Sequence, residues 1–244
     1  MAWETPKIDW GAADGVSDFD MNRIEGNALA LYEESARKNV TVYVSTSGND
    51  STGNGTSEAP YRTVGKALSV LPRDIRGFNV YVHIAAGAYT EAVSIKGFSG
   101  GVIRLSGANS AVTLTSLTID NSVVAVTSLP ITTTAAVGFI LTNRGSLSTT
   151  GNLTANGTST GLNISTGSHA HISGTLACPN ASTAVNCSGS STLYADAITG
   201  KGTLDASTGG VIAFNNSTLS RSTATGGRIN TGGQGTGLAN ASLE

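Results

Sequence analysis

The chain has 244 residues and a formal net charge of −2, so it lacks the basic balance that is typical of nucleic-acid-binding proteins. The first 99 residues hold 21 of the 30 charged side chains, and the remainder is rich in Ser, Thr, Asn and Gly. This composition fits either disorder or a β-structure with a thin core, and the apolar pattern must decide between them.

The N-terminus has no basic segment followed by an apolar one, so we expect no signal peptide. No apolar run approaches the roughly 18 residues of a membrane span, so we expect no membrane insertion. Cys178 and Cys187 are the only cysteines, and both fall at predicted inward positions. Two such residues form no disulfide framework, and buried free thiols are predicted.

A helix of about twenty residues is predicted after the Asp14-Gly15 turn signal. Ser17 can cap it, with Asp20 three residues later as in a capping box. An apolar seam with 3, 4, 3 spacing follows, formed by Met21, Ile24, Ala28 and Leu31. A helix with so narrow an apolar seam is only marginally stable alone in water. It predicts a partner: the β-domain of the same chain, further copies of the chain around a common axis, or another protein.

Two segments of this N-terminal region resemble minor structural proteins from the tails of phages that infect Gram-positive bacteria. They read Trp3-Glu-Thr-Pro-Lys-Ile-Asp-Trp10 and Asp18-Phe-Asp-Met-Asn-Arg-Ile-Glu-Gly-Asn27. The resemblance covers about the first 35 residues. It implies a location in the virion tail and attachment to other tail or baseplate proteins through the N-terminus.

Residues 40–106 predict the beginning of a β-domain. Val40, Val42 and Val44 alternate in strand fashion, and a short amphipathic helix is expected near residues 63–71, capped by Thr63 and ended by Pro72. The stretches YVSTSGNDSTGNGTSEAPYRTVGKAL (43–68) and VYVHIAAGAYTEAVSI (80–95) resemble the entry of pectate-lyase-like right-handed β-helix proteins. In that family the short helix plugs the open end of the coil.

Three ladders of apolar positions recur every 19–24 residues, as one turn of a three-sided parallel β-helix requires. The first contains Val93/Ile95, Leu117/Ile119, Phe139/Leu141, Leu162/Ile164, Val185/Cys187 and Leu204/Ala206. The second contains Ile103/Leu105, Val124/Val126, Leu147, Ala170/Ile172, Leu193/Ala195 and Ile212/Phe214. The third contains Val112/Leu114, Ile131, Leu153/Ala155, Leu176/Cys178, Ile198 and Leu219. Disordered sequence has no reason to keep three registers in phase.

The predicted fold class is therefore mainly β: a right-handed parallel β-helix of about six three-stranded turns, with an N-terminal α-helix and a short capping helix. The domain division is a docking or oligomerisation segment at 1–39, the β-helix at 40–220, and a Gly- and Thr-rich C-terminal tail at 221–244. The far end of so short a stack needs cover, for which oligomerisation is one solution. A homotrimer is expected, since three-fold symmetry would suit a tail tip.

Few residues of the predicted coil could carry catalysis. Glycoside hydrolysis needs two carboxylates held roughly 5–10 Å apart, and the late turns offer only Asp196 and Asp205 as candidates. The more economical interpretation is that both are scattered surface charges. We therefore expect no catalytic residues and no cofactor.

His169-Ala-His171 would place two imidazoles outward on one strand. The triplet is similar to the His-x-His motifs that, in phage fibres and spikes, enclose a metal on a three-fold axis. Two exposed histidines without a metal is the simpler interpretation, since a three-residue motif is weakly specific.

The sequence thus predicts a tail fibre or spike protein of a phage or phage-like particle, made without a signal peptide and located in the virion. Its expected partners are further copies of itself, other tail proteins, and a bacterial surface glycan or protein. The alternative function is a tailspike-like polysaccharide depolymerase, a glycan lyase or hydrolase, which rests on fold analogy alone.

Overall fold

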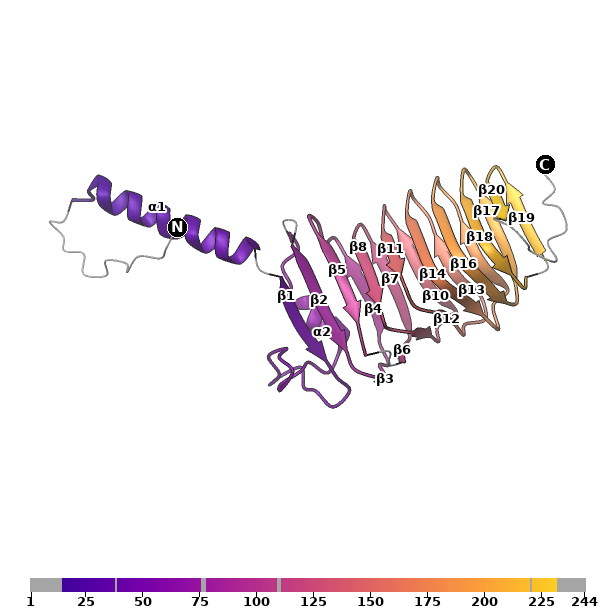
Figure 1. Cartoon of the computed structure of the whole chain (residues 1–244), viewed down its shortest axis with the longest axis horizontal. Coiled ribbons are helices and arrows are strands. Elements are labelled where there is room, and N and C mark those ends of the chain that lie inside the picture. The colour runs from indigo at the N-terminus through magenta and orange to yellow at the C-terminus, as the bar shows by residue number, and fades with distance from the viewer. Residues whose placement is uncertain (1–14, 38, 76–77, 109–110, 220, 232–244) are drawn as a thin grey trace.

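The computed structural model describes residues 15–37, 39–75, 78–108, 111–219 and 221–231, and its strands form a parallel β-solenoid of about six turns. Figure 1 shows the turns stacked in chain order from the N-terminal to the C-terminal end. Every strand pairing between named elements is parallel. The predicted fold class is thus confirmed as a parallel β-solenoid with two helices.

The strands form three faces, here named A, B and C in the order in which the chain visits them. Face A contains β1 (Val40–Val44), β2 (Asn79–Ile84), β5 (Val102–Ser106), β8 (Val123–Thr127), β11 (Ser146–Thr149), β14 (His169–Cys178), β16 (Thr192–Gly200), β18 (Val211–Ser217) and β20 (Arg228–Thr231). Face B contains β3 (Gly87–Ala88), β6 (Val112–Leu114), β9 (Ile131–Thr133) and β12 (Leu153–Ala155), and the second halves of β14, β16 and β18 continue it. Face C contains β4 (Ala92–Lys96), β7 (Ser116–Asp120), β10 (Val137–Thr142), β13 (Thr160–Ile164), β15 (Thr183–Cys187), β17 (Thr203–Ser207) and β19 (Arg221–Thr225).

The strand registers confirm the predicted stacking of apolar side chains. On face C, Leu117 pairs with Phe139, Phe139 with Leu162, and Leu162 with Val185. All four side chains are buried, with relative exposures of 0–1%. Such columns bury apolar area about every 4.8 Å along the coil, and this burial is the main force that holds the turns together.

Polar residues fill the places where the predicted ladders had gaps. Thr133 and Thr149 occupy inward positions of β9 and β11 and are fully buried. The Thr149 hydroxyl accepts a hydrogen bond from the Gly151 backbone N–H at 3.0 Å, which satisfies its polar atom inside the coil. The predicted last member of the third ladder is wrong, because Ser217, not Leu219, pairs with Ile198. Leu219 is buried beyond the strand end.

The solenoid continues past the predicted boundary at residue 220. Strands β19 and β20 pair in register with β17 and β18, and Ala224 extends the buried face C column through its pairing with Ala206. Residues 221–231 therefore belong to the coil and not to a separate tail. The apolar pattern did not predict this turn, because Ala224 and Ile229 are the only apolar residues on its two strands. The rest of the predicted tail, residues 232–244, lies outside the described residues.

Helix α2 (Val64–Ser69) covers the N-terminal opening of the solenoid, within the predicted 63–71. Its buried side chains, Val64, Ala67 and Leu68, join the core and contact β1 and β4. The Thr63 hydroxyl caps it by accepting a hydrogen bond from the Lys66 N–H at 3.1 Å, as predicted. The cap closes an end at which apolar core would otherwise meet water.

Two carboxylates hold this capping helix in place. Glu91 accepts hydrogen bonds from the Val64 and Gly65 N–H groups at 2.7 and 2.9 Å, which is the favourable position for an anion at a helix start. Asp50 accepts hydrogen bonds from the Arg62 N–H, the Thr63 N–H and the Thr63 hydroxyl. The loop that contains Asp50 and the residue that precedes β4 are thereby both tied to the start of α2.

Helix α1 (Asp18–Arg37) extends away from the first turn of the solenoid. Ser17 and Asp20 form the predicted reciprocal capping box, with two backbone-to-side-chain bonds of 3.2 Å. The predicted seam lies open: Met21, Ile24 and Leu31 are 47%, 50% and 55% exposed, and Ala28 is also exposed. Of the three partners considered for the seam, packing on the chain's own β-domain is not what the structure shows. The motif at residues 3–10 lies outside the described residues.

Candidate ligand-binding groove

An open groove of about 860 Å³ lies on the outer side of face A, near its N-terminal end. Its floor is formed by outward residues of β1, β2 and β5, and its wall by the loop between β1 and α2. Hydroxyl side chains dominate the lining: Ser45, Ser47, Ser57, Ser106, Thr127 and Ser128, with Tyr43, His83 and Glu58 among them.

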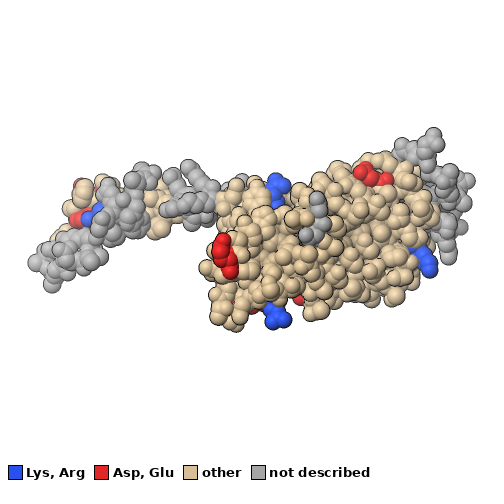
Figure 2. Space-filling view, turned by 60° about the horizontal axis from the view of Figure 1, so that its bottom comes forward, with Lys and Arg blue, Asp and Glu red and all other residues tan. Residues whose placement is uncertain are grey.

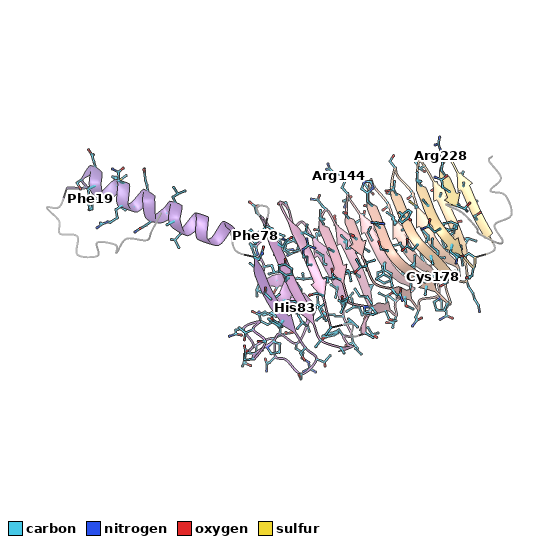
Figure 3. All side chains as sticks on the ribbon, viewed as in Figure 1. Phe19, Phe78, His83, Arg144, Cys178 and Arg228 are labelled. Carbon is cyan, nitrogen blue, oxygen red and sulfur yellow. The ribbon has the colours of Figure 1, made fainter. Side chains whose placement is uncertain are left out.

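Strand alternation places the groove's aromatic residues. Tyr43 and His83 pair in register on β1 and β2, between inward Val42 and Val44 and inward Val82 and Ile84. Their rings stack with centroids 5.0 Å apart, and the Tyr81 ring lies nearly parallel to the His83 ring at 6.4 Å. These three rings are the main aromatic group on the outer side of face A, and Figure 3 marks His83 at this end of the solenoid.

The imidazole of His83 is held by the next turn as well. Its Nδ1 lies 2.7 Å from the Ser106 hydroxyl, and the two residues are register partners on β2 and β5. His169 and Thr192, on adjacent turns of the same face, make the same kind of contact. The repetition shows that a His–hydroxyl bond between stacked turns is a feature of this coil. A catalytic serine is therefore not the natural interpretation of Ser106.

Glu58 supplies the groove's carboxylate. A hydrogen bond from the Ser57 hydroxyl, at 2.6 Å, lowers the pKa of Glu58 below its usual range, so the group is charged at neutral pH. A charged carboxylate accepts strong hydrogen bonds from ligand hydroxyl groups. No second carboxylate lines the groove among the described residues, so the pair that glycoside hydrolysis needs does not occur there.

The structure separates the two candidate catalytic acids. Asp196 is exposed on β16 of the face A–B sheet and lies 3.4 Å from the Asn215 amide nitrogen. Asp205 lies on β17 of face C, in register with Asn186 and Thr223. The packed core lies between these sheets, so the two carboxylates point away from each other and cannot flank one glycosidic bond.

His169 and His171 both point outward on β14, as predicted. The His171 ring packs against Tyr194 of the next turn, with centroids 5.0 Å apart. Within the described residues no group of three His, Cys, Asp or Glu side chains could hold a metal ion. His169 and His171 therefore do not belong to a group of three such ligands among the described residues of one chain.

Cys178 and Cys187 are buried free thiols, as predicted. Burial raises the pKa of Cys178 to about 12 and that of Cys187 to about 11, so both stay protonated at neutral pH. Thiols of this kind are neither nucleophiles nor metal ligands. They act as small apolar side chains in the columns.

Sequence reasoning missed the groove. The alternation around Tyr43 and around His83 shows that each points outward. Their proximity depends on the register of β1 against β2, which a loop and the capping helix separate in sequence.

Comparison with known proteins adds no further identification: no family model, no curated protein and no solved structure matches this chain. Among the described residues, the helices are all too short or too polar to cross a membrane.

Proposed function

We propose that this protein is a structural component of a phage or phage-like tail that recognises a bacterial surface glycan through the groove on face A. The observation that carries the proposal is the lining of that groove, where stacked aromatic rings adjoin many hydroxyl groups and one charged carboxylate. Sugars are bound by such mixtures, since C–H faces pack on rings while hydroxyls exchange hydrogen bonds.

The wider surface supports a role in contact rather than in chemistry. Figure 2 shows a solenoid exterior with few charged side chains on the side in view. A neutral hydroxyl-rich surface has no long-range preference for ionic partners and suits an uncharged polyol. The rigid coil below it fixes the groove residues without requiring a conformational change.

The tail location is supported by the resemblance of the N-terminal segments and by the exposed seam of α1. A helix of about 30 Å that leaves its apolar residues in water gains stability when another helix covers them. We propose that α1 attaches the protein to the tail, as a homotrimer or by docking to another tail or baseplate protein. The virion location is part of the same proposal.

The depolymerase alternative has less support, because Asp196 and Asp205 lie on different sheets. A metal on a three-fold axis, held by His169 and His171 of three chains, remains an option of the trimer proposal. Its test is the metal content of the assembled particle.

The function is tested by binding of the full chain to an array of bacterial surface polysaccharides. We expect binding to at least one glycan, and a loss of ten-fold or more for Tyr43→Ala and for His83→Ala. Tyr194→Ala, which removes an exposed aromatic ring elsewhere on face A, serves as the matched control and should retain binding.

Two outcomes would contradict the proposal. Equal binding by the groove variants and the wild type would show that the groove is not the site. Release of new reducing ends from the bound glycan, abolished by Glu58→Gln, would show an enzyme instead. Solution mass tests the assembly: a trimer that Ile24→Asp and Leu31→Asp together convert to a monomer supports axial association through α1.

A further inference from the structure

The corner between face C and the next strand of face A carries a second feature, which is independent of the groove. The chain reverses there through tight turns with two residues in the left-handed region. Asn143 and Arg144 have φ values of 52° and 62°, and the Gly145 N–H donates to the Thr142 carbonyl at 2.9 Å. This geometry is a type I′ turn, whose central positions favour glycine and asparagine.

The corner at residues 143–144 differs from the three that follow it. Each of those corners has a glycine at one of its two left-handed positions: Gly167 after Thr166, Gly189 before Ser190, and Gly209 after Thr208. The corner at Asn143 and Arg144 has none. A long side chain in this conformation costs backbone strain that glycine avoids, so Arg144 is present despite a local preference against it.

Among the described residues, no polar contact of the Arg144 side chain offsets that cost. Arg144 is exposed, and its guanidinium makes no hydrogen bond or ion pair with any described residue. Figure 3 shows Arg144 at the upper edge of the solenoid, where it points away from the coil. The left-handed conformation itself belongs to the fold, because Thr166 and Thr208 adopt it at later corners and the Arg144 N–H donates to the Thr166 carbonyl at 2.9 Å. The fold does not explain why a long cationic side chain occupies the position, and this is a reason to look for a ligand.

Arg144 lines a hollow of about 420 Å³ that spans four successive turns. The other polar side chains of the hollow are Lys96, Asp120, Asn121, Asn143 and Thr166. The Asp120 carboxylate is already satisfied: Lys96 Nζ lies 3.2 Å from one oxygen, and the Asn143 amide donates to the other at 2.9 Å. The Lys96 charge is thereby balanced, whereas the charge of Arg144 is not.

We infer that the hollow at this corner, here named the Arg144 hollow, binds an oxyanion. The oxyanion is a carboxylate or phosphate group carried by a surface polymer. The planar guanidinium can donate two parallel hydrogen bonds to such a group. Thr166 presents a hydroxyl from the next turn, and the hollow is wide enough for a sugar that carries the anion. The site lies at a different corner from the groove, so it can exist whether or not the groove binds glycan.

The test titrates the full chain with trigalacturonate, inorganic phosphate and neutral maltotriose at low salt, and follows the Nε–H signal of Arg144 by NMR. We expect at least one of the two anions to shift this signal and maltotriose not to. A response to trigalacturonate alone identifies a carboxylate site, and a response to phosphate alone identifies a phosphate site. Added salt should weaken the shift.

The decisive variant is Arg144→Gly, with anion binding followed by calorimetry. Glycine suits the left-handed backbone, so we expect binding to weaken at least ten-fold while the thermal midpoint stays equal or rises. Arg144→Lys should bind with intermediate strength, and Lys201→Ala, which removes an exposed positive charge elsewhere, should bind like the wild type. The inference is overturned if the wild type responds to neither anion. It is also overturned if Arg144→Gly binds the anion as the wild type does, or if the thermal midpoint of Arg144→Gly clearly falls. Tyr43→Ala and His83→Ala should leave this binding intact, which separates it from the groove.

Discussion

The first turns of the solenoid and the later ones share the same inward columns but differ on the outside. Residues 40–106 add a capping helix, a long loop held by Asp50, and stacked rings on face A. Residues 112–217 repeat strands and tight corners with little else. The inward columns thus fix the fold, while departures from regularity on the outside create the groove. The Arg144 hollow is likewise a departure from the regular pattern, confined to a single corner.

The largest effect should come from the columns of the regular turns. Phe139 is fully buried between Leu117 and Leu162, and we expect Phe139→Ala to lower the free energy of unfolding by about 3–5 kcal/mol. Ser148→Ala, outward on the neighbouring face, should change it by less than about 0.5 kcal/mol. Urea denaturation measures both. Similar losses for the two variants would mean that the inward columns do not dominate the stability of the coil.

The columns are also the part of the structure that the sequence predicts best. Positions such as Leu117 and Phe139 repeat with two constraints at once, alternation within a strand and a constant step between turns, so one register satisfies all of them. The misplacement of Leu219 and the missed strand β20 occur where small or polar residues replace the apolar ones.

The sites could not be predicted in the same way, because they depend on exterior pairings. Nothing in the spacing of Tyr43 and His83 indicates that a loop and a helix would return the chain to the neighbouring strand. His169 and His171 could be predicted as outward because they lie inside the repeat. The left-handed conformation of Arg144 could not be predicted from the sequence, since an arginine does not indicate a turn that favours glycine.

A smaller effect should appear at the cap of the first turns. Burial alone would raise the pKa of Asp50, but hydrogen bonds from the Thr63 hydroxyl and from the Thr63 and Arg62 N–H groups outweigh it and lower the pKa. The folded state therefore binds this proton less readily than the unfolded state. The stabilisation is present above the unfolded pKa, about 4, and is lost as pH falls through the lower folded value.

Asp50→Ala should accordingly lower the free energy of unfolding by about 1–2 kcal/mol at pH 7. The difference from the wild type should shrink as the pH approaches 3, and thermal melts across pH 3–7 measure it. Thr90→Ala, at an exposed position next to Glu91 in sequence, is the control and should show no pH-dependent difference. A constant difference for Asp50→Ala over that range would exclude the carboxylate as the cause.

The smallest effect should be a gain in stability at a late corner. Thr208 is exposed and has a φ of 49°, a conformation that a β-branched residue adopts at a cost and asparagine tolerates. Thr208→Asn should therefore raise the free energy of unfolding by about 0.5–1 kcal/mol. The same exchange at Thr154, which lies in β12 with extended backbone, should instead lower stability, because asparagine disfavours strands. If both exchanges destabilise equally, strain at these corners is negligible, and Arg144 is not retained against a backbone cost.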